Sequence, residues 1–171
     1  MGIKVGIKYD DDIFATLRAF NRLQKETEDR NPNSELRQAT KAISDELGKE
    51  IEKSAYVHRY SPAQAIKVAS TIRVQSDRIP KISIGKGRKK IFSGGGRAGD
   101  VLFGNEFGAI PNGIGNSNFK GGKRFPPRSP KSGRGNEGYW IFPTIKANER
   151  YVREQWLKMA NELAKTFSKD F

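Results

Sequence analysis

Cysteine is absent from this chain of 171 residues, and histidine occurs once, as His58. The lack of cysteine excludes disulfide bonds, thiolate zinc sites and thiol catalysis, and a single histidine argues against catalytic triads and multi-histidine metal sites. No apolar run approaches the roughly 20 residues that span a bilayer, and the first residues lack the apolar stretch of a signal peptide. We therefore expect no catalytic residues, no metal, no cofactor and no membrane partner.

Apolar residues are also scarce, since they make up 35% of the chain. That content allows a modest core and indicates that much of the chain lies outside it. A chain this short normally forms one domain. We predict a single domain over 1–171, with a helical part at 10–70, a sheet with long loops at 71–142 and a C-terminal helix at 143–170.

The positive charge is concentrated in the middle of the chain. The net charge is +13, from 32 basic and 19 acidic side chains. Residues 78–134 hold 13 basic side chains and only two acidic ones, Asp100 and Glu106, for a net charge of +11. Residues 78–138 also hold 15 of the 18 glycines. This composition is typical of strands joined by long, basic, glycine-rich loops, with charge-balanced helical parts on either side.

Apolar periodicity predicts three helices before this basic region. Three acids, Asp10 to Asp12, suit the N-terminus of a helix from about 11 to 29. Asn33 or Ser34 is expected to cap a second helix that runs to about residue 56. Ser61 and Pro62 predict the start of a short helix through Ala69, because proline fits the first helical position.

From Thr71 the pattern changes to alternation, which predicts two antiparallel strands, one through Ile72 and Val74 and one through Ile79, Ile82 and Ile84, with a turn near Ser76-Asp77. We expect the segments that follow to be a basic turn at 85–90, a flexible loop at 93–99, a compact apolar segment at 100–108, one long loop at 109–138, a last strand at 139–142 and a long final helix. The predicted class is α+β: two N-terminal helices and a long C-terminal helix packed on a small antiparallel sheet with long basic loops.

Three possible sites have simpler explanations. Gly85-Lys86-Gly87 lacks the Ser/Thr and the following helix of a phosphate-binding loop, so a basic turn is the better interpretation. The acids at 10–12 lack the spacing of a calcium loop. His58 stands just past a predicted helix end, where it can interact with the last carbonyls of that helix.

The basic middle third is the sharpest feature, and it favours contact with a polyanion. An acidic protein neighbour and mere solubility remain alternatives. No predicted helix carries the cluster, and phosphate contacts carry no base code, so reading of base sequence is not implied. The candidate DNA- or partner-facing loop residues are Lys86, Arg88, Lys89, Lys90, Lys123, Arg124, Arg128, Lys131 and Arg134.

Two short segments carry a resemblance to a known family. Phe103-Gly104-Asn105-Glu106-Phe107-Gly108-Ala109 contains a Glu-Phe-Gly turn, and Trp140-Ile141-Phe142-Pro143 precedes a helix that opens Thr144-Ile145-Lys146-Ala147-Asn148. Together with the order of the predicted elements, these segments resemble the tail-completion, or head–tail joining, proteins of long-tailed bacteriophages. The resemblance covers roughly residues 10–170 and does not clearly include the alternation from Ile3 to Tyr9.

The resemblance implies a structural virion protein that forms a ring, commonly sixfold, in the neck between the head connector and the tail. Implied partners are further copies of the chain, the connector or stopper, the tail terminator or tail tube, and DNA in the lumen. The implied location is the virion neck, and the host cytoplasm during assembly. Glu106, Phe107 and Gly108 would form a turn of the subunit core, and Tyr139 to Pro143, including Trp140 and Phe142, would be the strand feeding the last helix. The family has no catalytic residues to carry over.

Two other classes of function compete with this expectation. A nucleic-acid-binding accessory protein without sequence specificity would bind DNA as an isolated monomer, with a steep salt dependence. An enzyme acting on DNA would need acidic metal ligands near the basic surface, and only Asp100 and Glu106 are available in the middle third.

Overall fold

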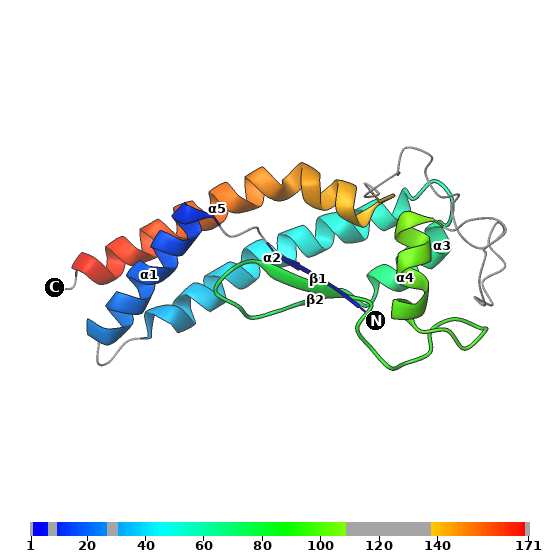
Figure 1. The fold of residues 1–171 in the computed structure, drawn as a ribbon, viewed down its shortest axis with the longest axis horizontal. Helices are drawn as coiled ribbons and strands as arrows, with labels where there is room; N and C mark the ends of the chain where they lie inside the picture. Colours follow the sequence, from blue (N-terminus) through cyan, green and yellow to red (C-terminus); the bar gives the residue numbers. More distant parts are fainter. Residues whose placement is uncertain (1, 7–9, 27–30, 109–137, 170–171) are drawn as a thin grey trace. The chain divides into compact units, whose positions relative to one another are not determined.

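The computed structural model describes residues 2–6, 10–26, 31–108 and 138–169 of the chain (Figure 1). Five helices and three short strands form within these residues. In chain order they are β1 (Ile3–Gly6), α1 (Asp11–Glu26), α2 (Pro32–Tyr56), α3 (Pro62–Ala69), β2 (Arg73–Val74), β3 (Lys81–Ile84), α4 (Ala98–Phe107) and α5 (Ile141–Lys169). The predicted combination of helices, a small sheet and a long C-terminal helix is therefore confirmed at the level of the α+β class.

The sheet has the strand order β1-β3-β2, and its predicted strands β2 and β3 form an antiparallel pair. The N–H of Gln75, just after β2, donates to the carbonyl of Lys81 at 3.0 Å. Among the described helices, none has both the length and the apolarity needed to cross a membrane.

The starts of the predicted helices are decided by short-range hydrogen bonds. Asp10 caps α1 as expected, since its Oδ1 accepts the N–H of Ile13 at 3.1 Å. The cap of α2 is not Asn33 or Ser34: Asn31 Oδ1 accepts the N–H of Ser34 at 3.0 Å. Pro32 then occupies the first helical position, where it loses no hydrogen bond. Pro62 likewise opens α3, as predicted, although the Ser61 side chain makes no capping bond.

Contacts divide the chain into two compact units. Unit 1 comprises Met1–Lys4, Gly48–Arg73 and Ser83–Ala147, and unit 2 comprises Val5–Leu47, Val74–Ile82 and Asn148–Phe171. The long helices α2 and α5 contribute residues to both units. The expectation of a single domain over 1–171 stays a prediction.

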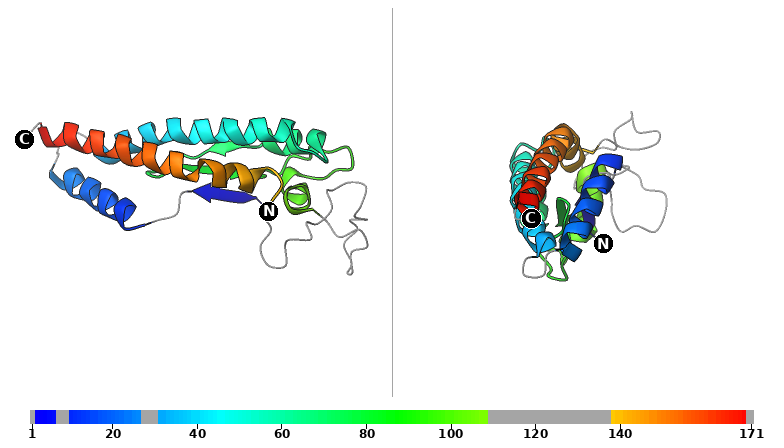
Figure 2. Two further views of the ribbon diagram at one scale, coloured as in Figure 1. Left: turned by 90° about the horizontal axis from the view of Figure 1, so that it is seen from above. Right: turned by 90° about the vertical axis from the view of Figure 1, so that its left-hand side faces the viewer.

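Unit 2 is built on the apolar stripes of α1, α2 and α5. In Figures 1 and 2, the first part of α2 and the C-terminal part of α5 run side by side. The indole of Trp156 is fully buried, and its Nε1–H donates to the carbonyl of Arg78 at 2.8 Å and to Thr40 Oγ1 at 3.2 Å. Ser44 Oγ accepts the N–H of Lys81 at 3.1 Å. These bonds satisfy the polar groups that the core of unit 2 buries.

Unit 1 contains α3 and α4, which lie side by side (Figure 1). Its buried side chains include Ile51, Val68, Ile84, Leu102 and Ile141. The helix α4 corrects two expectations, because a flexible loop was predicted at 93–99 and an apolar segment without assigned structure at 100–108. Residues of α4 are buried around much of its circumference, so it lacks the one-sided stripe from which helices are predicted.

Candidate functional site

The most constrained site in unit 1 is the carboxyl group of Glu106, near the end of α4. Glu106 is fully buried. Its Oε2 accepts the N–H groups of Ile141 at 2.9 Å and Trp140 at 3.3 Å, and its Oε1 accepts the N–H of Phe142 at 2.9 Å. These are among the N–H groups that have no acceptor within their own helix. One side chain from α4 therefore caps the N-terminus of α5, where the helix dipole favours negative charge.

This cap explains why the predicted strand at Tyr139–Phe142 is wrong. Ile141 is the first residue of α5, and Pro143 lies in its first turn, where a missing N–H costs no helical bond. Aromatic and β-branched residues favour a strand locally. Here Glu106, which lies 34 positions before Trp140 in the sequence, accepts hydrogen bonds from their N–H groups. This tertiary contact overrides the local preference for a strand.

Two glycines flank the cap, and Gly138 gives the carboxyl group its space. Gly108 ends α4 with φ 76°, and Gly138 precedes α5 with φ 75°, a left-handed conformation that favours glycine. A Cβ added to Gly138 would collide with Glu106 Oε1. The two segments that carry the family resemblance, Glu106-Phe107-Gly108 and Trp140 to Pro143, thus meet at this cap.

A second layer of hydrogen bonds surrounds the cap. Trp140 Nε1–H donates to Asn105 Oδ1 at 2.8 Å. His58 Nδ1 accepts the N–H groups of Ser61 at 2.9 Å and Tyr60 at 3.2 Å. Because Nδ1 is an acceptor, Nε2 carries the proton and donates to the carbonyl of Asn105 at 3.3 Å. The imidazole of His58 therefore binds a carbonyl of α4, while the backbone N–H of His58 binds a late carbonyl of α2, that of Ala55, at 3.4 Å.

Burial raises the pKa of Glu106 and lowers the pKa of His58. It raises the pKa of the Glu106 carboxyl from its ordinary value of 4.5 to about 7, while the N–H bonds from Phe142, Ile141, Trp140 and Tyr139 pull it down. Burial lowers the pKa of His58, which its bond to Asn105 opposes. A neutral imidazole fits the acceptor role of Nδ1.

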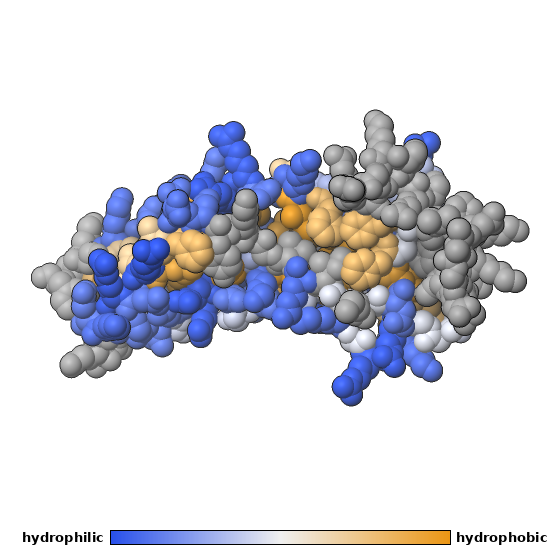
Figure 3. Space-filling view, viewed as in Figure 1, coloured by the Kyte–Doolittle hydropathy of each residue, from blue (hydrophilic) through white to orange (hydrophobic). Residues whose placement is uncertain are grey.

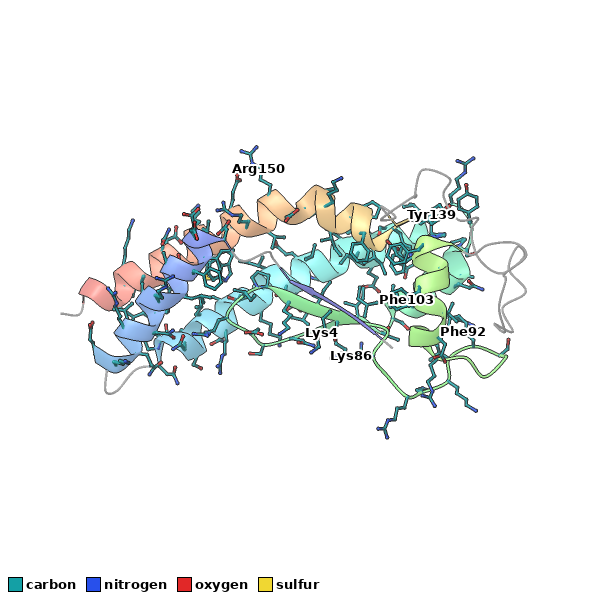
Figure 4. All side chains as sticks on the ribbon, viewed as in Figure 1. Lys4, Lys86, Phe92, Phe103, Tyr139 and Arg150 are labelled. Carbon is teal, nitrogen blue, oxygen red and sulfur yellow. The ribbon has the colours of Figure 1, made fainter. Side chains whose placement is uncertain are left out.

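A strip of phenylalanines lies on the surface beside the cap. Phe103 and Phe107 stack with ring centroids 6.1 Å apart, and Phe107 and Phe142 lie 5.4 Å apart. Phe103 is 45% exposed and Phe142 is 39% exposed. Figure 3 shows hydrophobic atoms gathered over α4 and the first turns of α5, and Figure 4 labels Phe103 there. Sequence reasoning missed this strip, because only the end of α4 brings Phe107 next to Phe142.

The predicted basic residues Lys86, Arg88, Lys89 and Lys90 are all exposed. The segment that follows is a tight hairpin, which corrects the flexible loop expected at 93–99. Lys90 and Arg97 form an antiparallel bridge, and the N–H of Ile91 donates to the carbonyl of Gly96 at 3.0 Å. The remaining candidates, Lys123, Arg124, Arg128, Lys131 and Arg134, lie outside the described residues, as does the long loop expected at 109–138 apart from Gly138.

Both acids of the middle third are engaged in capping. Asp100 Oδ2 accepts the N–H of Arg97 at 2.9 Å at the start of α4, and Glu106 caps α5. In the part of the chain that the structure describes, no three His, Cys, Asp or Glu side chains gather as metal ligands. The arrangement is suited to holding two helices together and presenting surfaces.

Comparison of the chain with protein-family models, with curated proteins and with solved structures finds no match in any of the three.

Proposed function

We propose that the chain is a structural protein of the neck of a long-tailed bacteriophage, a tail-completion protein that forms an oligomeric ring between the DNA-filled head and the tail. The observation that carries this proposal is the meeting of the two resembling segments at Glu106. They are far apart in the sequence, yet the carboxyl group of one binds three N–H groups of the other. The resemblance therefore falls on residues that form one structural feature.

Two surfaces of unit 1 support a role in an assembly. The exposed phenylalanines Phe103 and Phe142 form apolar surface of the kind that marks contacts between proteins. The exposed cations at 86–90 suit a place close to a polyanion. In this proposal the two N-terminal helices and the long C-terminal helix pack on the small antiparallel sheet and form the platform, and ring symmetry repeats one heterologous contact between copies.

The capping roles of Asp100 and Glu106 support a structural function over an enzymatic one. A nuclease-like centre near the basic surface would need carboxylates open to a metal ion and to substrate. Both of these carboxylates instead bind backbone N–H groups.

Removal of the gene from the virus that encodes the chain tests the proposal. We expect DNA-filled heads and finished tails to accumulate separately in electron micrographs, with infectivity restored when the wild-type chain is supplied from a plasmid. Plasmid-borne supply of an unrelated virion protein is the matched control and should restore nothing. Complete, infectious particles in the absence of the chain would overturn the proposal.

A second candidate is an accessory protein that binds nucleic acid without sequence preference, favoured by the exposed run Lys86, Arg88, Lys89 and Lys90. Mass spectrometry of purified particles separates the two. A neck protein is present in every particle in a fixed ratio to the tail proteins, whereas an accessory protein remains in the infected-cell lysate.

A further inference from the structure

Residues 86–97 and Lys67 form a dense group of cations in unit 1, which we call the basic hairpin. Its basic members are Lys67, Lys86, Arg88, Lys89, Lys90 and Arg97. All six are exposed. The segment 86–97 contains no acidic residue, and Asp100, the next acid along the chain, binds the N–H of Arg97. Within the described residues, no ion pair involves Arg88, Lys89 or Lys90, so these charges are not neutralised there.

Several contacts hold the basic hairpin in a defined shape. At its base, the N–H of Gly85 donates to Thr71 Oγ1 at 2.9 Å. Gly85 has φ 73°, and a Cβ there would lie 3.0 Å from Leu102 Cδ2, so the turn is packed closely against α4. Further along the segment, the bridge between Lys90 and Arg97 closes the turn that residues 91–96 form. Such fixed contacts reduce the entropy that must be lost when the cations meet a ligand.

The single aromatic ring of the segment is already engaged. The ammonium group of Lys67 lies 5.5 Å from the centroid of the Phe92 ring. Figure 4 labels Lys86 and Phe92. A protein partner normally needs an apolar or aromatic anchor at the centre of its interface, surrounded by polar residues. The basic hairpin offers consecutive exposed charges, and its two apolar side chains, Ile91 and Phe92, are only partly exposed, so its chemistry fits a regular array of negative charges better than a folded protein.

We propose that the basic hairpin binds the phosphate backbone of duplex DNA without reading base sequence. Duplex DNA carries one negative charge per roughly 1.7 Å of its axis, which offers successive partners to neighbouring cations. Phosphate contacts of this kind fix a protein on DNA and carry no sequence information. The inference rests on the proposed function in that a neck ring surrounds the passage of the genome, and it names the element that meets the DNA.

The test uses the full-length chain and a short fluorescent duplex of random sequence, with fluorescence anisotropy measured over a series of NaCl concentrations. The variant Arg88→Ala/Lys89→Ala/Lys90→Ala removes three charges, and the bridge of Lys90 survives because it is made by the backbone. The control variant Lys41→Ala/Lys49→Ala/Lys158→Ala removes three exposed charges from α2 and α5. Both variants have the same net charge.

We expect the hairpin variant to flatten the slope of log K against log [NaCl] by about 3, since each lost phosphate contact removes about 0.9. The control variant should keep nearly the wild-type slope and affinity. Circular dichroism melting of both variants checks that they are folded. Equal losses in the two variants, no binding by the wild-type chain, or tighter binding to polyglutamate than to the duplex would each overturn the inference.

The same variant separates this inference from the proposed function when it is supplied to the gene-deleted virus. If the hairpin variant binds DNA as tightly as the wild type and particles containing it assemble normally, the hairpin is not the DNA site. The neck role would still stand. The opposite result is also possible to recognise: the chain binds DNA through the basic hairpin but is missing from purified particles. That result would reject the neck role and leave the DNA site standing.

Discussion

Replacement of Glu106 by alanine is expected to lower the free energy of unfolding by about 3–5 kcal/mol at about pH 5. The substitution leaves the N–H groups of Trp140, Ile141 and Phe142 without their acceptor at the start of α5. Each buried donor without a partner costs about 1–3 kcal/mol, and the lost side chain adds a small cavity. Partial relaxation of the first turn of α5 keeps the total below the sum of these costs.

Urea unfolding followed by circular dichroism measures this loss. Glu162→Ala is the matched control, because Glu162 is an exposed residue of α5, and surface substitutions of this kind change stability by no more than about 0.5 kcal/mol. Glu106→Gln should fall between the two, since its amide oxygen can still accept part of the N–H set. A Glu106→Ala variant as stable as the Glu162→Ala control would show that the cap does not hold α5.

The stability contributed through Glu106 is expected to fall by about 2.5 kcal/mol as the pH rises from about 5 to about 8. The pKa of the carboxyl rises from its ordinary value of 4.5 to about 7 in the folded chain. Between these values the folded state binds more protons than the unfolded state, so raising the pH favours unfolding. The contribution is complete below the unfolded pKa and is lost as the pH passes the folded one.

His58 acts in the opposite direction and must be separated from Glu106. Burial lowers the pKa of His58 below its ordinary value of 6.5, so the stability that His58 contributes is present above that value and is lost as the pH falls. The difference in unfolding free energy between the wild type and Glu106→Gln isolates the carboxyl, because both chains keep His58. A difference that stays constant from about pH 5 to about pH 8 would contradict the raised pKa.

The helices with strong one-sided stripes could be predicted from the sequence. The apolar series through Ile13, Leu17 and Phe20 gave the start of α1, and the series through Leu36, Ile43 and Leu47 gave the body of α2. Strands β2 and β3 followed from alternation. In each case the period of the buried side chains is a local property of the sequence.

The fold around Glu106 could not be predicted in the same way. Helix α4 is buried on several sides and contains Gly99 and Gly104, so neither its periodicity nor its propensity favours a helix. The start of α5 depends on a contact between residues 34 positions apart, which no local pattern encodes. An acid inside an apolar segment, as at Glu106, was the available signal, since a buried carboxylate needs donors.

The resemblance pointed to some residues of the candidate site, and nothing in the sequence indicated the others. Glu106, Trp140 and Phe142 were named as residues of two motifs, but their contact was not foreseen. Asn105 and the donor role of His58 were missed, because a single amide and a single imidazole between helices give no spacing to interpret. Of the predicted basic residues, Lys86, Arg88, Lys89 and Lys90 are exposed, and the remainder lie outside the described residues. That these residues face DNA or a partner stays a prediction.

Electron cryomicroscopy of the assembled virus particle, at a resolution that shows side chains, tests the neck role most directly. We expect a closed ring of this chain between head and tail, with Lys86, Arg88, Lys89 and Lys90 turned toward the DNA channel. A neck built entirely from other proteins, or a ring of this chain with all four cations on its outer wall away from any partner, would contradict this expectation.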